Sequence, residues 1–341
     1  TVWLILDRLN YLKSEAELES VISRESSFLF NNLILLASCF AVLWGTLFPV
    51  ITEKLANNKI SLDADWFNRL MVPIGLFLLF LTGVGPLFAW RRTSMESLRK
   101  NFMLPGIGML VVAAALFAGG MRYPYSIISL SFCFFVAATI AMEFFRGARA
   151  ISEKAGVGFV PAVIELTHRN TRRYGGYLVH MGVVLMFIGF SGAPFDQKAV
   201  GEVSKGSTMQ VGAYSLKVVD LTQGEKPDYV WDTAVLQVSK NGRNLGTLEP
   251  TRLFYKAQQQ ATAEVGLRPR LNEDLYINYA ARQGDKAVLQ AYVKPLVNWI
   301  WIGALVLVMG TLIALVPSKV ARSYPRTEVV GIAKKNAPVE A

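Results

Sequence analysis

Six long apolar segments constrain the fold of this 341-residue chain more than any other feature of its sequence. Each is close to the roughly 20 residues that a helix needs to cross a bilayer. Helices satisfy their own backbone hydrogen bonds, so such segments are predicted to span the membrane as helices. The six predicted spans are residues 28–51, 70–90, 102–121, 124–145, 174–191 and 296–316.

The overall composition fits an integral membrane protein that also has a soluble part. Hydrophobic residues make up 52% of the chain, which also contains seven tryptophans. A net charge of +10 is a feature shared with nucleic-acid-binding proteins. Here, however, the lysines and arginines lie beside the apolar segments rather than on one basic face. We therefore exclude nucleic acid as a partner.

The distribution of lysine and arginine predicts which side of the membrane each connection faces. Short cytoplasmic loops are enriched in these residues. Connection 52–68 has only Lys54 and Lys59. The segments after the second, fourth and last spans contain many more lysines and arginines. Because the chain crosses the membrane twice between each of these segments and the next, all three lie on the same side. Both ends of the chain are therefore predicted to be cytoplasmic, with residues 192–295 outside. The cations that carry this prediction are Arg91, Arg92, Arg99, Lys100, Arg146, Arg149, Lys154, Arg169, Arg172, Arg173, Lys319, Arg322, Arg326, Lys334 and Lys335.

Residues 192–295 have the pattern of a small β-domain. Apolar and polar residues alternate in short runs at 214–219, 229–238, 275–279 and 287–293, which predicts strands. The dipeptide Asn241-Gly242 between two such runs is a strong signal for a tight hairpin. With 13 Lys and Arg against 11 Asp and Glu, the segment is nearly neutral. We predict a β-sandwich or barrel.

The predicted fold class is a polytopic α-helical membrane protein with a small all-β periplasmic domain inserted before the last span. Residues 1–27 would contain the tail of a truncated hydrophobic span and a cytoplasmic linker. Residues 28–191 would form a membrane domain with five spans, and 192–295 the β-domain. Residues 296–316 would be the last span and 317–341 a cytoplasmic tail.

The fifth span carries His180, one of only two histidines in the chain. It lies roughly 9 Å inside the span, counted from residue 174 at the helical rise. An ionisable side chain at that depth is costly and usually faces the interior of the bundle. One interpretation is a neutral histidine hydrogen-bonded to a neighbouring helix, and the other is an axial ligand of a metal or haem. Gly175, Gly176 and Gly182 would let another helix or a flat cofactor approach.

The other polar residues of interest have simpler interpretations. His168 falls in a basic connection, where it is expected to be solvated. Glu143 is expected to reach water from the end of its span. Asn31 and Asn32 could form a polar contact between helices or merely mark the membrane interface.

The familiar catalytic and redox motifs are missing from the sequence. It contains no Walker loop, GxSxG elbow, HExxH helix or CxxC pair. The two cysteines, Cys39 and Cys133, are expected to be inert core residues because both fall inside apolar runs. The residues alone thus yield an architecture without an activity.

Seven short blocks, spread over nearly the whole chain, carry a family resemblance. They are residues 23–32 (SRESSFLFNN), 43–49 (LWGTLFP), 85–92 (GPLFAWRR), 174–182 (YGGYLVHMG), 264–268 (EVGLR), 273–276 (EDLY) and 295–301 (PLVNWIW). In this order they resemble the C-terminal half of cytochrome c maturation protein F. That family comprises cytochrome c haem lyases of the haem-handling protein superfamily.

The resemblance implies an activity, a cofactor and partners. A family member takes haem from a periplasmic haem chaperone and attaches it covalently to the CxxCH cysteines of apocytochrome c. It lies in the bacterial inner membrane and works with thioredoxin-like and apocytochrome-binding maturation subunits. The resemblance also implies an intramembrane haem b with His180 as one axial ligand. It assigns no catalytic residue.

The chain also departs from the family pattern. Family members are longer, and their N-terminal half carries a tryptophan-rich motif, two external histidines and the second haem b ligand. This sequence has no Trp-Trp-Asp motif and no histidine in 192–295. We therefore expect a fragment or split-gene product that attaches haem only with an N-terminal half or partner subunit.

Two other functions compete with this interpretation. The first is a non-catalytic membrane scaffold that docks cytochrome c maturation partners. The second is a haem or solute transporter. A transporter is disfavoured because the sequence shows neither an inverted repeat nor paired broken helices.

Overall fold

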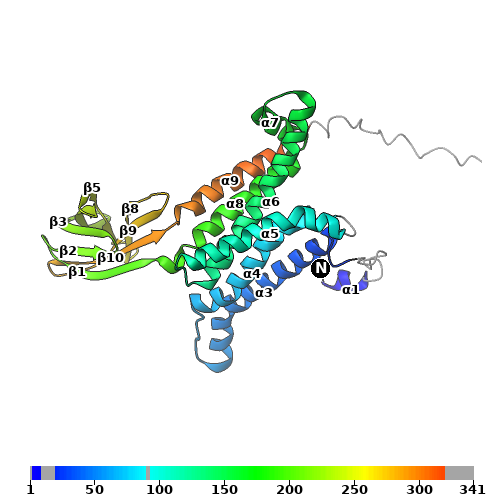
Figure 1. Ribbon diagram of the computed structural model, residues 1–341. Coiled ribbons are helices and arrows are strands. Elements are labelled where there is room, and N and C mark those ends of the chain that lie inside the picture. The colour runs from blue at the N-terminus through cyan, green and yellow to red at the C-terminus, as the bar shows by residue number, and fades with distance from the viewer. Residues whose placement is uncertain (1, 9–19, 90–92, 319–341) are drawn as a thin grey trace, which may run out of the picture.

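The computed structural model describes residues 2–8, 20–89 and 93–318. Within them, six helices are long and apolar enough to cross a membrane. They form a bundle with a β-domain at one end and the short helices α1 (Val2–Asp7) and α7 (Phe159–Arg169) at the other (Figure 1). The six predicted spans are thereby confirmed as helices. These are α3 (Arg24–Ala56), α4 (Ala64–Val84, continued by the 3-10 turn η1, Gly85–Leu87), α5 (Met95–Ala118), α6 (Pro124–Ala155), α8 (Thr171–Phe190) and α9 (Asn298–Leu315).

Several helices extend beyond the apolar cores from which they were predicted. Helix α3 begins at Arg24 because the hydroxyl of Ser23 caps it, accepting a hydrogen bond from the amide of Ser26 at 3.1 Å. Helix α6 runs past residue 145 to Ala155, where Gly156 adopts a positive φ of 65° and ends it. Polar helix ends carry no hydropathy signal, so the predicted boundaries were too short.

Helix α7 was not predicted, since residues 159–169 were assigned to a connection. Its Ala162 and Leu166 lie one turn apart and are buried in the cluster that includes residues of α6 and α8. His168 lies in its last turn and is exposed. The expectation that His168 meets solvent is therefore confirmed, while its assignment to a loop was wrong.

Helices α8 and α9 pack through glycines with almost no space between their backbones. A Cβ atom added at Gly175 would lie 2.6 Å from the amide nitrogen of Ala314. One added at Gly182 would lie equally close, 2.6 Å, to the amide nitrogen of Leu307. Small residues allow this close packing in membrane helices. Of Gly175, Gly176 and Gly182, the first and the third therefore serve a contact with α9.

The interior of the bundle is formed mainly by α4, α6, α7 and α8. Its most buried side chains include Leu79 and Val136, which are 1% and 0% exposed. Cys133 also belongs to this cluster, as expected. Cys39 does not: it is exposed on α3, so its prediction as a core residue was wrong. A continuous apolar run shows that every face of a helix is hydrophobic, but it does not show which face packs against other helices.

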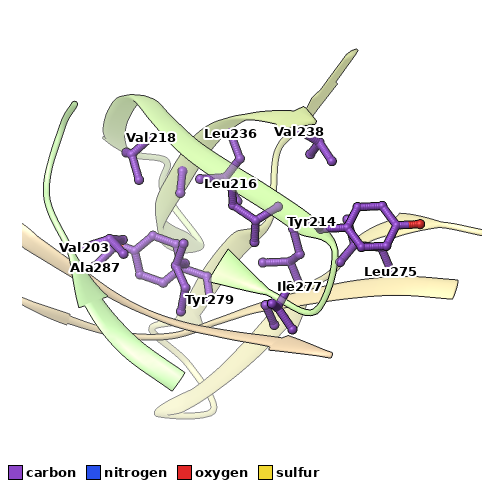
Figure 2. Packing of buried hydrophobic residues seen from close by; sticks show 14 of the residues in the cluster. Val203, Tyr214, Leu216, Val218, Leu236, Val238, Leu275, Ile277, Tyr279 and Ala287 are labelled. Carbon is purple, nitrogen blue, oxygen red and sulfur yellow. The ribbon is translucent and has the colours of Figure 1, made fainter. Parts of the chain in front are cut away.

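The β-domain is a sandwich of two antiparallel sheets. One sheet has the order β1-β10-β9-β8 and the other β2-β3-β4-β6-β7, with β5 paired to β4. The side chains between them, among them Leu216, Leu236, Ile277 and Tyr279, gather into one apolar core (Figure 2). The strands are β1 (Gln197–Val203), β2 (Thr208–Val211), β3 (Tyr214–Glu225), β4 (Tyr229–Lys240), β5 (Arg243–Leu248), β6 (Thr251–Tyr255), β7 (Gln260–Glu264), β8 (Gly266–Arg268), β9 (Glu273–Gln283) and β10 (Lys286–Pro295).

The predicted strands and the hairpin are present. Asn241 and Gly242 connect β4 to β5 with φ values of 49° and 78°, the positive angles that this short turn requires. Of the two architectures predicted for this segment, the sandwich is the observed one. Most of the predicted linker and tail, residues 9–19 and 319–341, lie outside the described residues, as do Arg91 and Arg92.

The sandwich joins the bundle through β1 and β10, two strands that are adjacent in one sheet. β1 follows α8 after the 3-10 turn η2 (Ala193–Phe195), and β10 leads into α9. These two strands pair antiparallel along seven residue pairs, from Gln197 opposite Val293 to Val203 opposite Ala287. The helix pair α8–α9 thus continues into a strand pair.

Candidate functional site

A cavity of about 700 Å³ opens among α3, α4 with η1, and α8. The first residues of α3 and α8 lie around it, at the end of these helices remote from the β-sandwich. His180, a titratable residue from the middle of α8, takes part in its lining. The lining residues are Arg24, Ser27, Phe28, Asn31, Leu81, Thr82, Gly85, Pro86, Asn170, Arg172, Arg173, Gly176, Tyr177 and His180.

Helical periodicity explains how α3 contributes to this cavity. Arg24, Ser27, Phe28 and Asn31 follow one another at spacings of three, one and three residues, which places them on one face. That face changes from a guanidinium at the helix terminus to an aromatic ring and an amide further in. A polar stripe on a membrane helix is costly unless it faces protein or a ligand. On α3 it faces the cavity.

His180 reaches the cavity from α8. Its side chain is half-buried, and its Nδ1 atom is buried with no hydrogen-bond partner among the described residues. One turn earlier, a Cβ atom added at Gly176 would meet nothing within 4 Å. Gly176 thus leaves open space next to the imidazole, unlike Gly175 and Gly182, which contact α9. The structure shows no bond to a neighbouring helix at Nδ1, although the packing interpretation of His180 calls for one.

Arg24 lines the cavity from the first turn of α3. Its Nη2 atom donates a hydrogen bond of 2.5 Å to the carbonyl oxygen of Pro86 in η1. Its Nε atom is buried and, like Nδ1 of His180, has no partner among the described residues. Five buried side-chain nitrogen or oxygen atoms in the described residues lack a partner, and the two in the membrane helices belong to these two cavity-lining residues.

Arg173 is fixed by a different contact. Its Nη2 atom donates to Oε2 of Glu143 on α6 at 2.5 Å, and the hydroxyl of Tyr177 donates to the same oxygen at 3.4 Å. The Glu143 side chain is only 15% exposed. The expectation that Glu143 reaches water was therefore wrong, because it forms an ion pair across two helices instead.

The chemistry of the lining differs between the two ends of the cavity. Among the described residues, three arginines and no carboxylate line it, and its inner part carries apolar groups, the amide of Asn31 and one imidazole. A neutral imidazole is a common metal ligand. The described residues contain no group of three or more His, Cys, Asp or Glu side chains that could hold a bare metal ion. His180 is thus suited to a metal carried within a larger organic cofactor, such as the iron of a haem.

Sequence reasoning found His180 but missed the arginines around it. Arg172 and Arg173 were used only to predict orientation, and Arg24 was placed in the predicted linker of residues 1–27. The signal that would have included Arg24 is its helical spacing from Asn31, a polar residue inside the predicted span. For Asn31 the sequence left open a polar contact between helices or a position at the membrane interface, and the structure places it in the cavity lining.

The comparisons with known proteins agree on one family. Residues 195–295 match the family model "CcmF C-terminal beta-sandwich". Cytochrome c-type biogenesis protein CycK of Rhizobium meliloti is 29% identical over 304 residues, which are 86% of this chain and 43% of that protein. Cytochrome c-type biogenesis protein CcmF of Haemophilus influenzae is 27% identical over 305 residues, 86% of this chain and 45% of that protein.

A solved structure supports the same relationship at the level of the fold. "Cytochrome c Heme Lyase CcmF" superimposes with a TM-score of 0.73 at 23% identity, covering 87% of this chain and 46% of that one. The chain spans less than half the length of the curated relatives it matches. Its described residues include six helices long and apolar enough to span a membrane, its residues 195–295 match the model of the CcmF C-terminal beta-sandwich, and along most of its length it is similar to CcmF-type cytochrome c biogenesis proteins.

Proposed function

We propose that this chain is the C-terminal part of a haem lyase complex that attaches haem to the CxxCH cysteines of apocytochrome c. The similarity to CcmF-type biogenesis proteins over 86% of the chain supports this assignment. Because the chain spans less than half of those relatives, the complex also needs an N-terminal half or partner carrying the tryptophan-rich motif. The chain by itself is not expected to attach haem.

Within this complex we propose His180 as one axial ligand of an intramembrane haem b. The observation that carries this proposal is the buried, unpartnered Nδ1 atom of His180 beside a cavity of about 700 Å³. When bound, haem iron would supply one-electron redox chemistry. The neutral imidazole would provide the ligating lone pair, and Gly176 would leave room for the macrocycle next to it.

The remaining residues of the site would control orientation and solvent. Phe28 and Leu81 line the cavity with apolar surface, which favours a flat apolar ligand over water. The Glu143–Arg173 ion pair ties α6 to α8 near the cavity and would keep the wall in place. We assign no residue of this chain to the thioether-forming step itself, since positioning a substrate haem would depend on the partner that carries the tryptophan-rich motif.

The orientation of the chain follows from its arginines. We propose that it lies in the bacterial inner membrane with the arginine-rich ends cytoplasmic and the β-sandwich in the periplasm. The sandwich would then face the haem chaperone, apocytochrome c, and the thioredoxin-like and apocytochrome-binding subunits. A thiol reagent that does not cross the membrane should label a cysteine placed at Asn241 from the periplasmic side. A cysteine at Ala341 should react only after permeabilisation, and labelling of both from one side would refute the orientation.

Spectroscopy of the assembled complex tests the ligand assignment. His180→Ala should abolish or sharply shift the Soret band, and added imidazole should partly restore it by occupying the space left by the side chain. His168→Ala is the matched control and should leave the band unchanged, because His168 is exposed on α7. If His180→Ala retains the wild-type spectrum and haem content, the ligand assignment is wrong and the scaffold function gains support.

A further inference from the structure

We propose that the arginine end of the cavity binds the carboxylates of the haem, with Arg24 as the main contact and Arg172 as the second. The haem would then lie with its carboxylate edge toward the end of the bundle remote from the β-sandwich. This inference rests on the proposed haem function and adds a carboxylate-binding role for residues outside the iron ligand. It concerns positioning rather than catalysis.

The first observation is the incomplete hydrogen bonding of Arg24. The carbonyl of Pro86 accepts from Nη2 and thereby fixes the direction of the guanidinium plane. The buried Nε atom of the same plane has no partner among the described residues. A buried donor without a partner is unfavourable, and a carboxylate is the acceptor that matches the planar fork of arginine. The guanidinium of Arg24 is thus held in a fixed orientation and lacks an acceptor that an anion could provide.

The second observation is the balance of charge around the cavity. Of its three arginines, Arg173 is neutralised by Glu143. Neither Arg24 nor Arg172 has an ion pair with a described residue, and no Asp or Glu among the described residues lines the cavity. A partly buried charge such as that of Arg24 is expected to be paired, and the exposed Arg172 adds a second positive charge to the same lining. Two positive charges are therefore available for an anionic ligand.

The third observation is the distance between the charged end and the imidazole. Arg172 and His180 are eight residues apart on α8, which corresponds to about 12 Å along the helix. Along α3, Arg24 and Asn31 are separated by about 10 Å. The ligand must therefore place an apolar, metal-containing body beside His180 and its anionic groups at one edge. Haem, with a flat apolar ring and two carboxylates on one side, has this distribution.

Haem dimethyl ester provides the test, because it keeps the iron and the ring but has no charged carboxylates. The purified chain, together with the partner that completes the complex, is depleted of haem and reconstituted in nanodiscs. It is then titrated with haem and with the ester while the Soret band is followed. The wild type should bind haem at least tenfold more tightly than the ester. Arg24→Gln should lose this preference while binding the ester like the wild type.

Matched variants separate a direct contact from a general loss of charge or structure. Arg172→Gln should reduce the preference for haem less than Arg24→Gln, because its side chain is exposed. Arg149→Gln removes an arginine of α6 that does not line the cavity, so it should behave like the wild type. His180→Ala should alter the Soret band with both ligands without removing the preference between them.

Three results would overturn the inference. Equal affinity of the wild type for haem and its ester would show that the carboxylates are not bound. Equal weakening of both ligands by Arg24→Gln would make Arg24 a purely structural residue. Loss of a co-purifying anionic phospholipid from Arg24→Gln, with haem affinity unchanged, would assign the site to lipid. A failure of the haem function itself appears separately, as a Soret band that does not depend on His180.

Discussion

The β-sandwich and the helix bundle cover their apolar groups in opposite ways. The core of the sandwich is closed: Leu216, Leu236, Leu275 and Ile277 are all 0% exposed. The bundle leaves large apolar surfaces of α3 and α5 uncovered. Of the five buried side-chain atoms without a partner in the described residues, two lie in the bundle, in Arg24 and His180, and three lie in the sandwich, in Arg252, Arg268 and Asn278. Lipid can cover an apolar face, but it cannot pair with a buried imidazole or guanidinium. The apolar core of the sandwich is therefore closed within this chain, whereas the bundle exposes apolar helix faces and has unpartnered polar atoms on two residues that line its cavity.

The sharpest test of the closed core is the substitution Leu236→Ala. Removing this fully buried side chain should lower the free energy of unfolding of the sandwich by about 2–5 kcal/mol. Hydrogen–deuterium exchange of the amides in β3 and β4, measured in the full chain, reports this loss. Leu271→Ala is the control, because Leu271 is 63% exposed and should change stability by less than about 0.5 kcal/mol. Similar effects of the two variants would mean that the core is less well packed than the structure indicates.

The second test compares two glycines of α8: Gly182, which packs against α9, and Gly176, which faces open space. Gly182→Val would bring side-chain atoms against the backbone of α9 and should destabilise the bundle by about 1–3 kcal/mol. Gly176→Val faces open space and should change helix stability much less while lowering haem affinity, because the added methyl groups would occupy the cavity. Helical circular dichroism during thermal unfolding measures the first effect and a haem titration the second. A larger loss of stability for Gly176→Val would contradict the assignment of these two faces.

The smallest expected effect concerns the acid sensitivity of the sandwich. Burial raises the pKa of Glu273, but hydrogen bonds from Lys240 and the Tyr214 hydroxyl outweigh it, so the pKa lies below its ordinary 4.5. A carboxyl whose pKa is lowered by folding stabilises the folded state above the ordinary pKa. That contribution is lost as the pH falls from about 4.5 through the lowered pKa.

Glu273→Gln should therefore flatten the decline in sandwich stability between about pH 5 and pH 3, by less than about 1 kcal/mol. Hydrogen exchange of β9 and β3 as a function of pH measures the slope. The control is Glu264→Gln, which alters an exposed carboxyl on β7. An unchanged slope in Glu273→Gln would show that the contacts with Lys240 and Tyr214 contribute nothing to acid stability.

The comparison also explains how much of the molecule could be predicted from its sequence. The sandwich strands show period-two alternation, and Asn241-Gly242 specifies a turn with positive φ, so both were evident. The spans were evident from their length and apolarity. His180 stood out because an ionisable residue inside an apolar run has few ordinary explanations. Each of these features is local in the sequence.

The errors concern features that depend on a distant partner. Glu143 lies near the end of the predicted span 124–145 but well inside the longer helix α6, and its partner Arg173 is 30 residues away. Cys39 and Cys133 sit in equally apolar runs, yet only Cys133 faces another helix. Arg24 resembles any cation at the end of a span until Pro86, 62 residues further on, is placed beside it. Periodicity reveals the faces of a helix but not the neighbour of each face.

The junction between sandwich and bundle has a mechanical consequence. Strands β1 and β10 are paired along seven residues, and the helices that continue them, α8 and α9, touch backbone to backbone at Gly175 and Gly182. At the junction, Gly192 lies so close to the carbonyl of Pro295 that no side chain would fit between them. These contacts couple the sandwich rigidly to the helix pair α8–α9. A rotation of the sandwich relative to the bundle would therefore move α8, the helix that carries His180.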